Sequence, residues 1–461
     1  MGLRHKLLRL QLFDERGLAA HTVKSLKLLI WSIAFGTISI NITGGVAMTG
    51  YLKTLGASDF VFGLIYAIGP IAAPLQLAAS YILERTRKRK NLLIAFGLIQ
   101  RTVWLPFGLT PFIIPMDQPA LRIWMAALYL MISSVSAPFL NVSFFSLAAD
   151  LVPMDIRGRY FAVRTRVATV FSVAGGILTA WVLDTFTGFN GYALVFALAT
   201  VTGVMDIVCF FAVEFPAMAA RERTETFGKM LSGVLRNRKY MKFTLFMALW
   251  YFAVCLSGPF YMVHLRTGVQ FSNTLITLLM QILPNICSIL IITRWGQGLD
   301  MYGNRTIMRI TGCFLWVSSF FWIFTGHGSV TASIVLVAIV GLMQGFVYPG
   351  FDIGINNMMM GQAPQMNRSM YIAVYLTVTS ILGIGAANAA GGWLLDNVFA
   401  RLEPFQFSVF GVVMTRYNWL FALTALLRCG MFFVAFPRLL PGDGDTPVRE
   451  VLARVLKRLA H

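Results

Sequence analysis

Long apolar stretches, separated by short polar segments, run through almost the whole chain. A helix needs about 20 mostly apolar residues to cross the roughly 30 Å hydrocarbon layer of a membrane. Lipid offers no hydrogen-bond partner to an unpaired backbone amide, so each stretch of this length is predicted to be helical. The pattern therefore predicts an all-α membrane protein with twelve transmembrane helices, at residues 26–50, 60–83, 91–114, 122–148, 160–184, 190–213, 243–263, 271–293, 306–326, 330–358, 369–395 and 416–437.

The positions of the basic residues predict the orientation of these helices. The chain is 57% hydrophobic and 12% charged, with a net charge of +19. Such a charge could indicate nucleic-acid binding, but that function needs a basic patch on a folded polar surface. Here, with the N-terminus placed in the cytoplasm, 31 of the 38 Lys and Arg fall in cytoplasmic segments and five in outer loops. This positive-inside bias predicts that both termini are cytoplasmic and argues against a nucleic-acid partner.

The two halves of the chain repeat one another. The segment LVPMDIRGRYFAVR at 151–164 matches APQMNRSMYIAVY at 363–375 with a constant offset of 211 residues. The matched pairs are Pro153 with Pro364, Arg157 with Arg368, Tyr160 with Tyr371 and, upstream, Pro138 with Pro349. We therefore expect two six-helix bundles, 26–213 and 243–437, joined by a basic cytoplasmic linker at 214–242. A basic amphipathic N-terminus (1–25) and an amphipathic tail (438–461) are expected on the cytoplasmic side.

With this repeat, the chain resembles the major facilitator superfamily over nearly its whole length. The loop signature of that family, G-x-x-x-D-[RK]-x-G-R-[RK], is similar to two segments here. The first holds Ser80, Glu84, Arg85, Arg87, Lys88 and Arg89, and the second holds Gly296, Asp300, Gly303 and Arg305. The resemblance implies a secondary transporter whose halves rock around a central site. We further expect a monomer in the plasma membrane that needs no cofactor and no metal.

Charged residues at the predicted cytoplasmic helix ends are candidates for a gate. Ion pairs between the two halves would hold the cytoplasmic side closed and break as it opens. The alternative is that the arginines are positive-inside anchors only. The candidate gate residues are Glu84, Arg85, Asp150, Arg157, Asp300, Arg305 and Arg368.

A polar face on the tenth predicted helix is the candidate binding site. Gln344, Tyr348, Asp352 and Asn356 recur every four residues, a spacing that places them on one face of a helix. An ionisable group within a membrane span is costly, so it is expected to face a water-filled cavity or a partner. Asp352 could bind substrate or a proton, or instead cap a helix distorted by Pro349 or pair with an arginine.

The resemblance adds further candidate cavity residues and leaves other intramembrane charges unassigned. It implies that helices 1, 4, 7 and 10 line the cavity, which adds Asn41, Asn141 and Trp250. Arg101 and Asp206 lie at equal depth in helices 3 and 6, which predicts a structural ion pair. Arg428 lies at a similar depth in helix 12, with no evident acidic partner.

Together these features favour a secondary active transporter of a small organic solute, with protons as a candidate coupling ion. A lipid or amphiphile flippase or exporter of the same fold is the first alternative. A non-transporting membrane receptor or scaffold is the second. A membrane-embedded enzyme is not supported, because the sequence holds neither an H-E-x-x-H nor a G-x-S-x-G motif.

Overall fold

The structure is a computed structural model that describes residues 19–154, 156–217, 227–327, 329–364, 368–409 and 412–435. The amphipathic tail, most of the N-terminal segment and the middle of the basic linker lie outside the described residues. Within the described ranges, twelve helices are long and apolar enough to cross a membrane. The twelve predicted spans are therefore confirmed.

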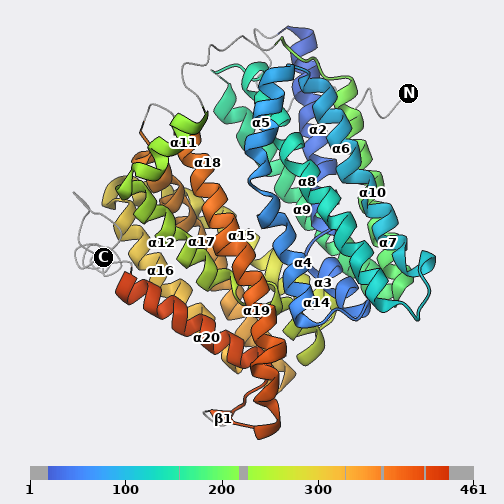
Figure 1. The fold of residues 1–461 in the computed structure, drawn as a ribbon, viewed down its shortest axis with the longest axis vertical. Helices are drawn as coiled ribbons and strands as arrows, with labels where there is room; N and C mark the ends of the chain where they lie inside the picture. Colours follow the sequence, from blue (N-terminus) through green and yellow to red (C-terminus); the bar gives the residue numbers. More distant parts are fainter. Residues whose placement is uncertain are drawn as a thin grey trace. The chain divides into compact units, whose positions relative to one another are not determined.

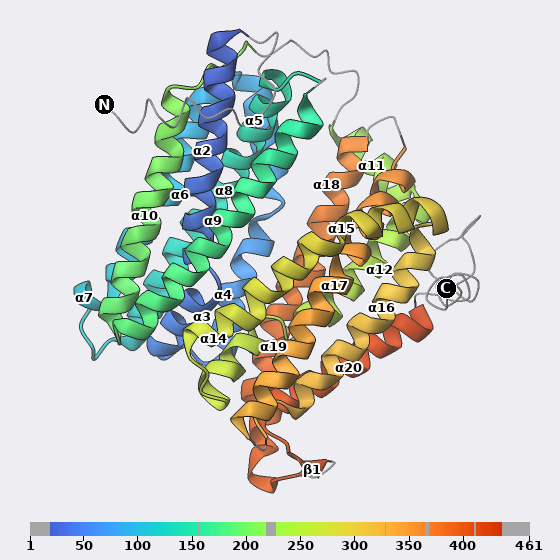
Figure 2. The same ribbon diagram turned by 180° about the vertical axis from the view of Figure 1, so that it is seen from behind.

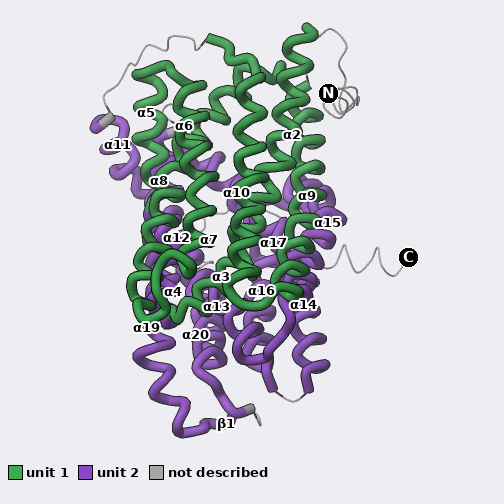
Figure 3. Tube along the Cα trace, turned by 90° about the vertical axis from the view of Figure 1, so that its right-hand side faces the viewer, with its two compact units in different colours: residues 1–57, 72–222 green, residues 58–71, 223–461 purple. Residues whose placement is uncertain are grey.

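The chain divides into two compact units (Figure 3). Unit 1 holds residues 1–57 and 72–222, and unit 2 holds residues 58–71 and 223–461. The boundary near residue 222 lies within the predicted linker. Residues 58–71, which form the first half of the second predicted span, are grouped with unit 2 although their neighbours on both sides belong to unit 1.

Unit 1 consists of helices that run side by side (Figure 1). The first span bends between α2 and α3, where Gly45 adopts a positive φ of 50° that glycine tolerates without strain. The elements are α2 (Ala20–Ile42), α3 (Gly45–Thr54), α5 (Leu75–Thr86), α6 (Arg89–Thr102), α7 (Trp104–Ile113), α8 (Pro119–Leu151), α9 (Arg157–Thr185) and α10 (Phe189–Phe211).

The described elements of unit 2 are helical apart from one short hairpin, and Figure 2 shows α16 and α20 side by side within this unit. Several of its spans contain π-helical turns, which are the η segments in the following list. The elements are α4 (Asp59–Ala72, of which Ala72 belongs to unit 1), α11 (Phe227–Arg236), α12 (Arg238–Cys255), α13 (Phe260–Val263), η1 (His264–Gly268), α14 (Asn273–Thr277), η2 (Leu278–Ile282), α15 (Leu283–Tyr302), α16 (Asn304–Phe321), α17 (Val330–Gln362), α18 (Arg368–Val378), η4 (Thr379–Gly385), α19 (Ala386–Asn397), α20 (Arg416–Gly430) and η7 (Met431–Ala435).

The remaining elements of unit 2 are short. They are the 3₁₀ turns η3 (Trp322–Phe324), η5 (Phe399–Arg401) and η6 (Glu403–Phe405), and the strands β1 (Ser408–Val409) and β2 (Val412–Val413). The two strands pair antiparallel, with Ser408 opposite Val413. They occupy the segment that precedes the last span.

Local signals fix where several helices begin and end. The Ser329 hydroxyl accepts a hydrogen bond from the backbone N–H of Ala332 at the start of α17. Thr415 and Asn418 form a reciprocal capping box at the start of α20. Such caps satisfy backbone donors that have no partner inside the helix. Gly303, with φ of 87°, separates α15 from α16.

The internal repeat is visible in the helices themselves. α8 and α17 are both 33 residues long, and each contains a proline nineteen residues after its first residue. Both their starts and their ends are 211 residues apart, which is the offset found in the sequence. Each unit also has a tyrosine bond between its first and fifth spans. The Tyr160 hydroxyl donates to the Leu26 carbonyl, and the Tyr240 hydroxyl donates to the Tyr371 carbonyl.

Candidate functional site

The polar residues of α17 share one face, and apolar residues occupy another. We call Gln344, Tyr348, Asp352 and Asn356 the α17 polar face. Gln344 and Asp352 are half-buried, Asn356 is exposed, and Tyr348 is 43% exposed. The apolar residues Val347, Phe351 and Ile355 are buried in the hydrophobic core of unit 2. Unit 2 therefore folds around the apolar side of α17 and leaves its polar side accessible.

Asp352 is the charged centre of the α17 polar face. The Asn356 side chain donates to the Asp352 carbonyl at 3.0 Å and to the Asp352 carboxylate at 3.4 Å. Within the described ranges, no lysine, arginine or histidine forms an ion pair with this carboxylate. Pairing with an arginine, one of the alternatives that the sequence left open, is thus not observed. A half-buried acid without a cation is available to a ligand or a proton.

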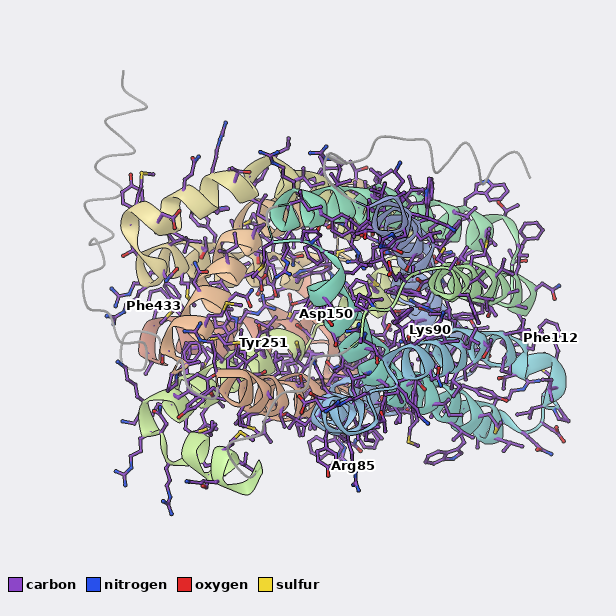
Figure 4. The ribbon with its side chains drawn as sticks, turned by 90° about the horizontal axis from the view of Figure 1, so that it is seen from above. Arg85, Lys90, Phe112, Asp150, Tyr251 and Phe433 are labelled. Carbon is purple, nitrogen blue, oxygen red and sulfur yellow. The ribbon has the colours of Figure 1, made fainter. Side chains whose placement is uncertain are left out.

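Three tyrosines lie within electrostatic range of this carboxylate. Tyr251 of α12, Tyr348 of α17 and Tyr375 of α18 all interact electrostatically with Asp352. Figure 4 places Tyr251 within the helices of unit 2, whereas Phe433 lies at the edge of that unit. Tyr375 was missed by sequence reasoning, although it ends the repeated segment at 363–375. Phenol rings and one carboxylate form a surface that can bind an organic molecule by stacking and by hydrogen bonds.

Trp250 lies apart from the α17 polar face. Its side chain is 2% exposed, and its ring centroid lies 4.7 Å from that of Phe351. The ring therefore belongs to the packed core of unit 2. The sequence placed Trp250 on a cavity wall because helical spacing alone does not tell which face of α12 meets α17. The neighbouring Tyr251, which the sequence offers on the same helix, interacts electrostatically with Asp352.

The two candidate asparagines lie in unit 1. Asn41 is half-buried in α2 and donates to the Thr37 carbonyl of its own helix at 2.9 Å. Asn141 is exposed on α8. Also in unit 1, the Arg164 guanidinium of α9 lies over the Phe144 ring, 4.4 Å from its centroid.

Arg101 and Asp206 meet in the core of unit 1. The Arg101 guanidinium donates to the Asp206 carboxylate at 2.7 Å, and both side chains are more than 90% buried. The Ser32 hydroxyl donates to the other carboxylate oxygen at 2.6 Å. These bonds tie α2, α6 and α10 together. An ion pair with both partners hydrogen-bonded is the arrangement in which charge is tolerated inside a membrane span.

Arg428 is held by neutral acceptors. It is 6% exposed, and it donates to the Val254 carbonyl at 3.1 Å, to the Leu315 carbonyl at 3.4 Å and to the Ser319 hydroxyl. These bonds connect α20 with α12 and α16. No acidic partner of Arg428 is found in the described part of the chain. The sequence did not reveal what Arg428 binds, and the structure shows that it binds two carbonyls and a hydroxyl.

Asp150, one of the candidate gate residues, forms an ion pair within unit 1. Its carboxylate pairs with Arg89 of α6 at 2.6 Å. Arg89 also donates to the carbonyls of Ser146 and Pro216. Arg157 instead donates to the carbonyls of Ala149 and Val152, which end α8 without helical partners. The choice between two nearby arginines depended on helix packing.

The other gate candidates lie at helix ends of the two units. Glu84, Arg85, Asp300 and Arg368 are exposed, and Arg305 is half-buried. Figure 4 shows Arg85 at an edge of unit 1. Ion pairs between the halves stay a prediction.

Comparison with known families assigns the chain. A model described as Major Facilitator Superfamily matches residues 28–388. The chain belongs to the major facilitator superfamily. Its family and its fold are those of transporters, and it is an integral multi-pass membrane protein. A comparison with curated proteins finds no match.

Solved structures of this superfamily have similar folds. A mutant of the nucleoside transporter NupG is 14% identical, with a TM-score of 0.70 over 90% of this chain and 100% of that chain. A bacterial homologue of the iron transporter ferroportin is 13% identical, with a TM-score of 0.66 over 92% and 99% of the two chains. A D-xylose-proton symporter is 12% identical, with a TM-score of 0.64 over 92% and 99%. At these identities the similarity concerns the fold alone.

Proposed function

We propose that this protein is a secondary active transporter that moves a small organic solute across the plasma membrane by alternating access. The α17 polar face, centred on Asp352, contacts the solute. The observation that carries this proposal is a half-buried intramembrane carboxylate with no cationic partner among the described residues, on an accessible polar face. Members of this superfamily bind their substrates near the middle of the membrane, which supports a site on this face within the span.

The chemistry of this face favours an organic solute. Tyr251, Tyr348 and Tyr375 offer rings and hydroxyls, and Asn356 and Gln344 offer amides. These groups recognise polar organic molecules through hydrogen bonds and stacking. The single carboxylate adds a site for a cationic group of the solute or for a coupling proton.

Uptake into proteoliposomes tests this proposal. The purified protein is reconstituted and offered a chemically broad panel of solutes, with and without a pH gradient. We expect at least one small organic solute to accumulate. Asp352→Asn should then abolish either the dependence on the pH gradient or the binding of the solute. The first result assigns Asp352 to proton coupling, and the second assigns it to solute binding.

Asp117→Asn is the matched control. It also removes one carboxylate, but Asp117 is exposed in a loop of unit 1, far along the chain from α17. We expect the control to transport like the unmodified protein. If Asp352→Asn also behaves like the unmodified protein, Asp352 is not part of the site. If no solute accumulates under any condition, the transporter proposal itself is contradicted.

A further inference from the structure

The seventh span leaves one face exposed along most of α12. Beginning with the first residue of that helix, Arg238, Lys242, Leu245 and Leu249 recur at intervals of four, three and four residues. This spacing places all four on one side of a helix. The two cations are exposed, and so are the leucines, Leu245 to 47% and Leu249 to 55%. We call these four residues the α12 exposed face.

The opposite side of α12 packs inside unit 2. Phe243, Met247 and Trp250 are at most 2% exposed and belong to the hydrophobic core of this unit. The preceding helix α11 adds Val234 to the same core, and Figure 1 shows α11 beside the end of α18. Packing on that side fixes the orientation of α12. Its exposed face is therefore a constant part of the surface of unit 2.

The chemical character of the α12 exposed face changes along the helix. The two cations occupy its first two positions, and the two leucines follow deeper in the span. Lys239, next to Arg238, is exposed as well. Leu249 lies about 10 Å further along the helix axis than Lys242, which is within the length of an acyl chain. A phospholipid has the same order, with a charged phosphate group at the membrane surface and apolar chains below it.

The positive charge at this end of α12 is not balanced by acidic side chains. Residues 227–263 contain no Asp or Glu. Within the described ranges, no ion pair is formed by the four nearest cations, Arg236, Arg238, Lys239 and Lys242. The start of a helix adds a partial positive charge, and the cap of α12 is a neutral Asn237 side chain, which accepts from the Tyr240 N–H at 3.1 Å. All these groups attract an anion to the same place.

From these features we infer that the α12 exposed face binds a phospholipid with a net negative headgroup, such as phosphatidylglycerol. The phosphate group contacts Arg238, Lys239 and Lys242, and one acyl chain lies along Leu245 and Leu249. The distribution of basic residues predicts that this end of α12 meets the cytoplasmic leaflet, where basic segments next to a span attract anionic lipids. The bound lipid reduces the repulsion among the cations and thereby stabilises the junction of α11 and α12.

A bound lipid differs from general attraction of anionic lipids to basic loops. At the bound site the headgroup and the chain are held by one helix face, so the lipid is selected by charge and also needs its chain. Arg87 and Lys88 are exposed at the same predicted side of the membrane, but they lie in the connection between α5 and α6. General attraction would treat the two pairs of cations alike.

A fluorescent reporter on the α12 exposed face tests the inference. The five native cysteines are replaced, Leu249→Cys is labelled with a fluorophore, and the protein is reconstituted in phosphatidylcholine. Phosphatidylglycerol or phosphatidylcholine that carries a nitroxide on an acyl chain is then added as a quencher. We expect phosphatidylglycerol to quench at lower mole fractions. Arg238→Gln with Lys242→Gln should reduce this preference by about 25-fold, since each cation near an anionic headgroup contributes about fivefold.

The matched control is Arg87→Gln with Lys88→Gln, which also removes two exposed cations and should keep the preference. If the α12 double variant does not fold, Lys242→Gln alone should reduce the preference by about fivefold. Equal quenching by the two lipids in the unmodified protein overturns the inference. An equal loss in the control variant also overturns it, because general attraction then explains the preference.

Soluble glycerol phosphate separates a lipid site from a simple anion site. It has the charge of the headgroup but no acyl chain, so it should not relieve the quenching by phosphatidylglycerol. Relief at similar concentrations would show that the cations bind any phosphate, which contradicts a lipid site. None of these measurements uses a transported solute, so the proposed transport function is tested separately.

Discussion

Two arginine–carboxylate pairs of unit 1 differ in burial, and burial decides what each contributes to stability. Both side chains of Arg101 and Asp206 are more than 90% buried, whereas the Asp150 side chain that pairs with Arg89 is 43% exposed. Removing one partner of a buried pair leaves an uncompensated charge, which costs about 3–5 kcal/mol. The Arg89 side chain is itself only 2% exposed, but it also donates to the Ser146 and Pro216 carbonyls and water can reach the place of the Asp150 carboxylate, so the loss of Asp150 should cost less.

We therefore expect Asp206→Asn to lower the free energy of unfolding by several kcal/mol and Asp150→Asn to lower it by less. Denaturant or thermal unfolding in detergent measures both. Replacing both partners, as Arg101→Met with Asp206→Leu, should recover most of the loss because no charge is left buried. Equal effects of the two single substitutions would show that burial does not govern these pairs.

A substitution at Gly36 offers a second test of the packing around the Arg101–Asp206 pair. A Cβ atom at this position would lie 2.7 Å from a carboxylate oxygen of Asp206. Gly36→Ala should destabilise the protein by about 1–3 kcal/mol, as overpacking of a core usually does. Gly158→Ala is the control, because a Cβ atom there meets nothing within 4 Å and alanine favours the helix. Melting temperatures of the two variants should differ in opposite directions from that of the unmodified protein.

Contacts between single residues could be predicted from the sequence where the depth of each residue in the membrane was enough to identify its partner. Arg101 and Asp206 could be paired by counting residues from the cytoplasmic side, and the structure brings them together. The partner of Asp150 could not be predicted, because Arg89 and Arg157 lie at the same predicted membrane surface and helix packing decides between them. Helix packing also decides that Trp250 lies in the core and not on a polar cavity wall, which the sequence alone could not show.

At the scale of elements, apolar length predicted all twelve spans, but interruptions within spans were not predicted. The breaks at Thr43–Gly44 and Ala73–Pro74, and the π-helical turns of unit 2, change the hydropathy of a span very little. They depend on which backbone groups meet across helices. The grouping of residues 58–71 with unit 2 could not be predicted either, because it depends on close contacts between glycines and the backbone of α4 and α19.

From the close contact between α4 and α19 we can predict how one added methyl group at Gly392 affects α4. Gly392→Ala would place a Cβ atom 2.2 Å from the Asp59 carbonyl oxygen, so α4 should be displaced from α19. We expect faster deuterium exchange of the backbone amides of α4, with other helices of unit 2 unchanged. Gly296→Ala in α15, where nothing lies within 4 Å, should leave exchange unaltered. Unchanged exchange in α4 of the Gly392 variant would contradict the close packing.

At the scale of the whole molecule, the distribution of Lys and Arg predicts which side of the membrane each loop faces. Thr54, between the first two spans, should lie outside the cell, and Lys88, after the second span, should lie in the cytoplasm. Both residues are exposed. A membrane-impermeant thiol reagent added to intact cells should label a cysteine at position 54 and spare one at position 88. The reverse pattern would invert the predicted topology.

Alternating access requires that one end of the molecule closes when the other end opens. Distances between spin labels, measured by pulsed electron paramagnetic resonance, test this most directly. One pair of spin labels is placed at the exposed outer positions Thr54 and Arg401, and another at the exposed inner positions Lys88 and Met301. The two residues of each pair belong to different units. We predict two distance populations for each pair. A change of pH or solute that increases the population with the longer outer distance should also increase the population with the shorter inner distance. A single fixed distance at both ends, or a lengthening of both together, would contradict the account.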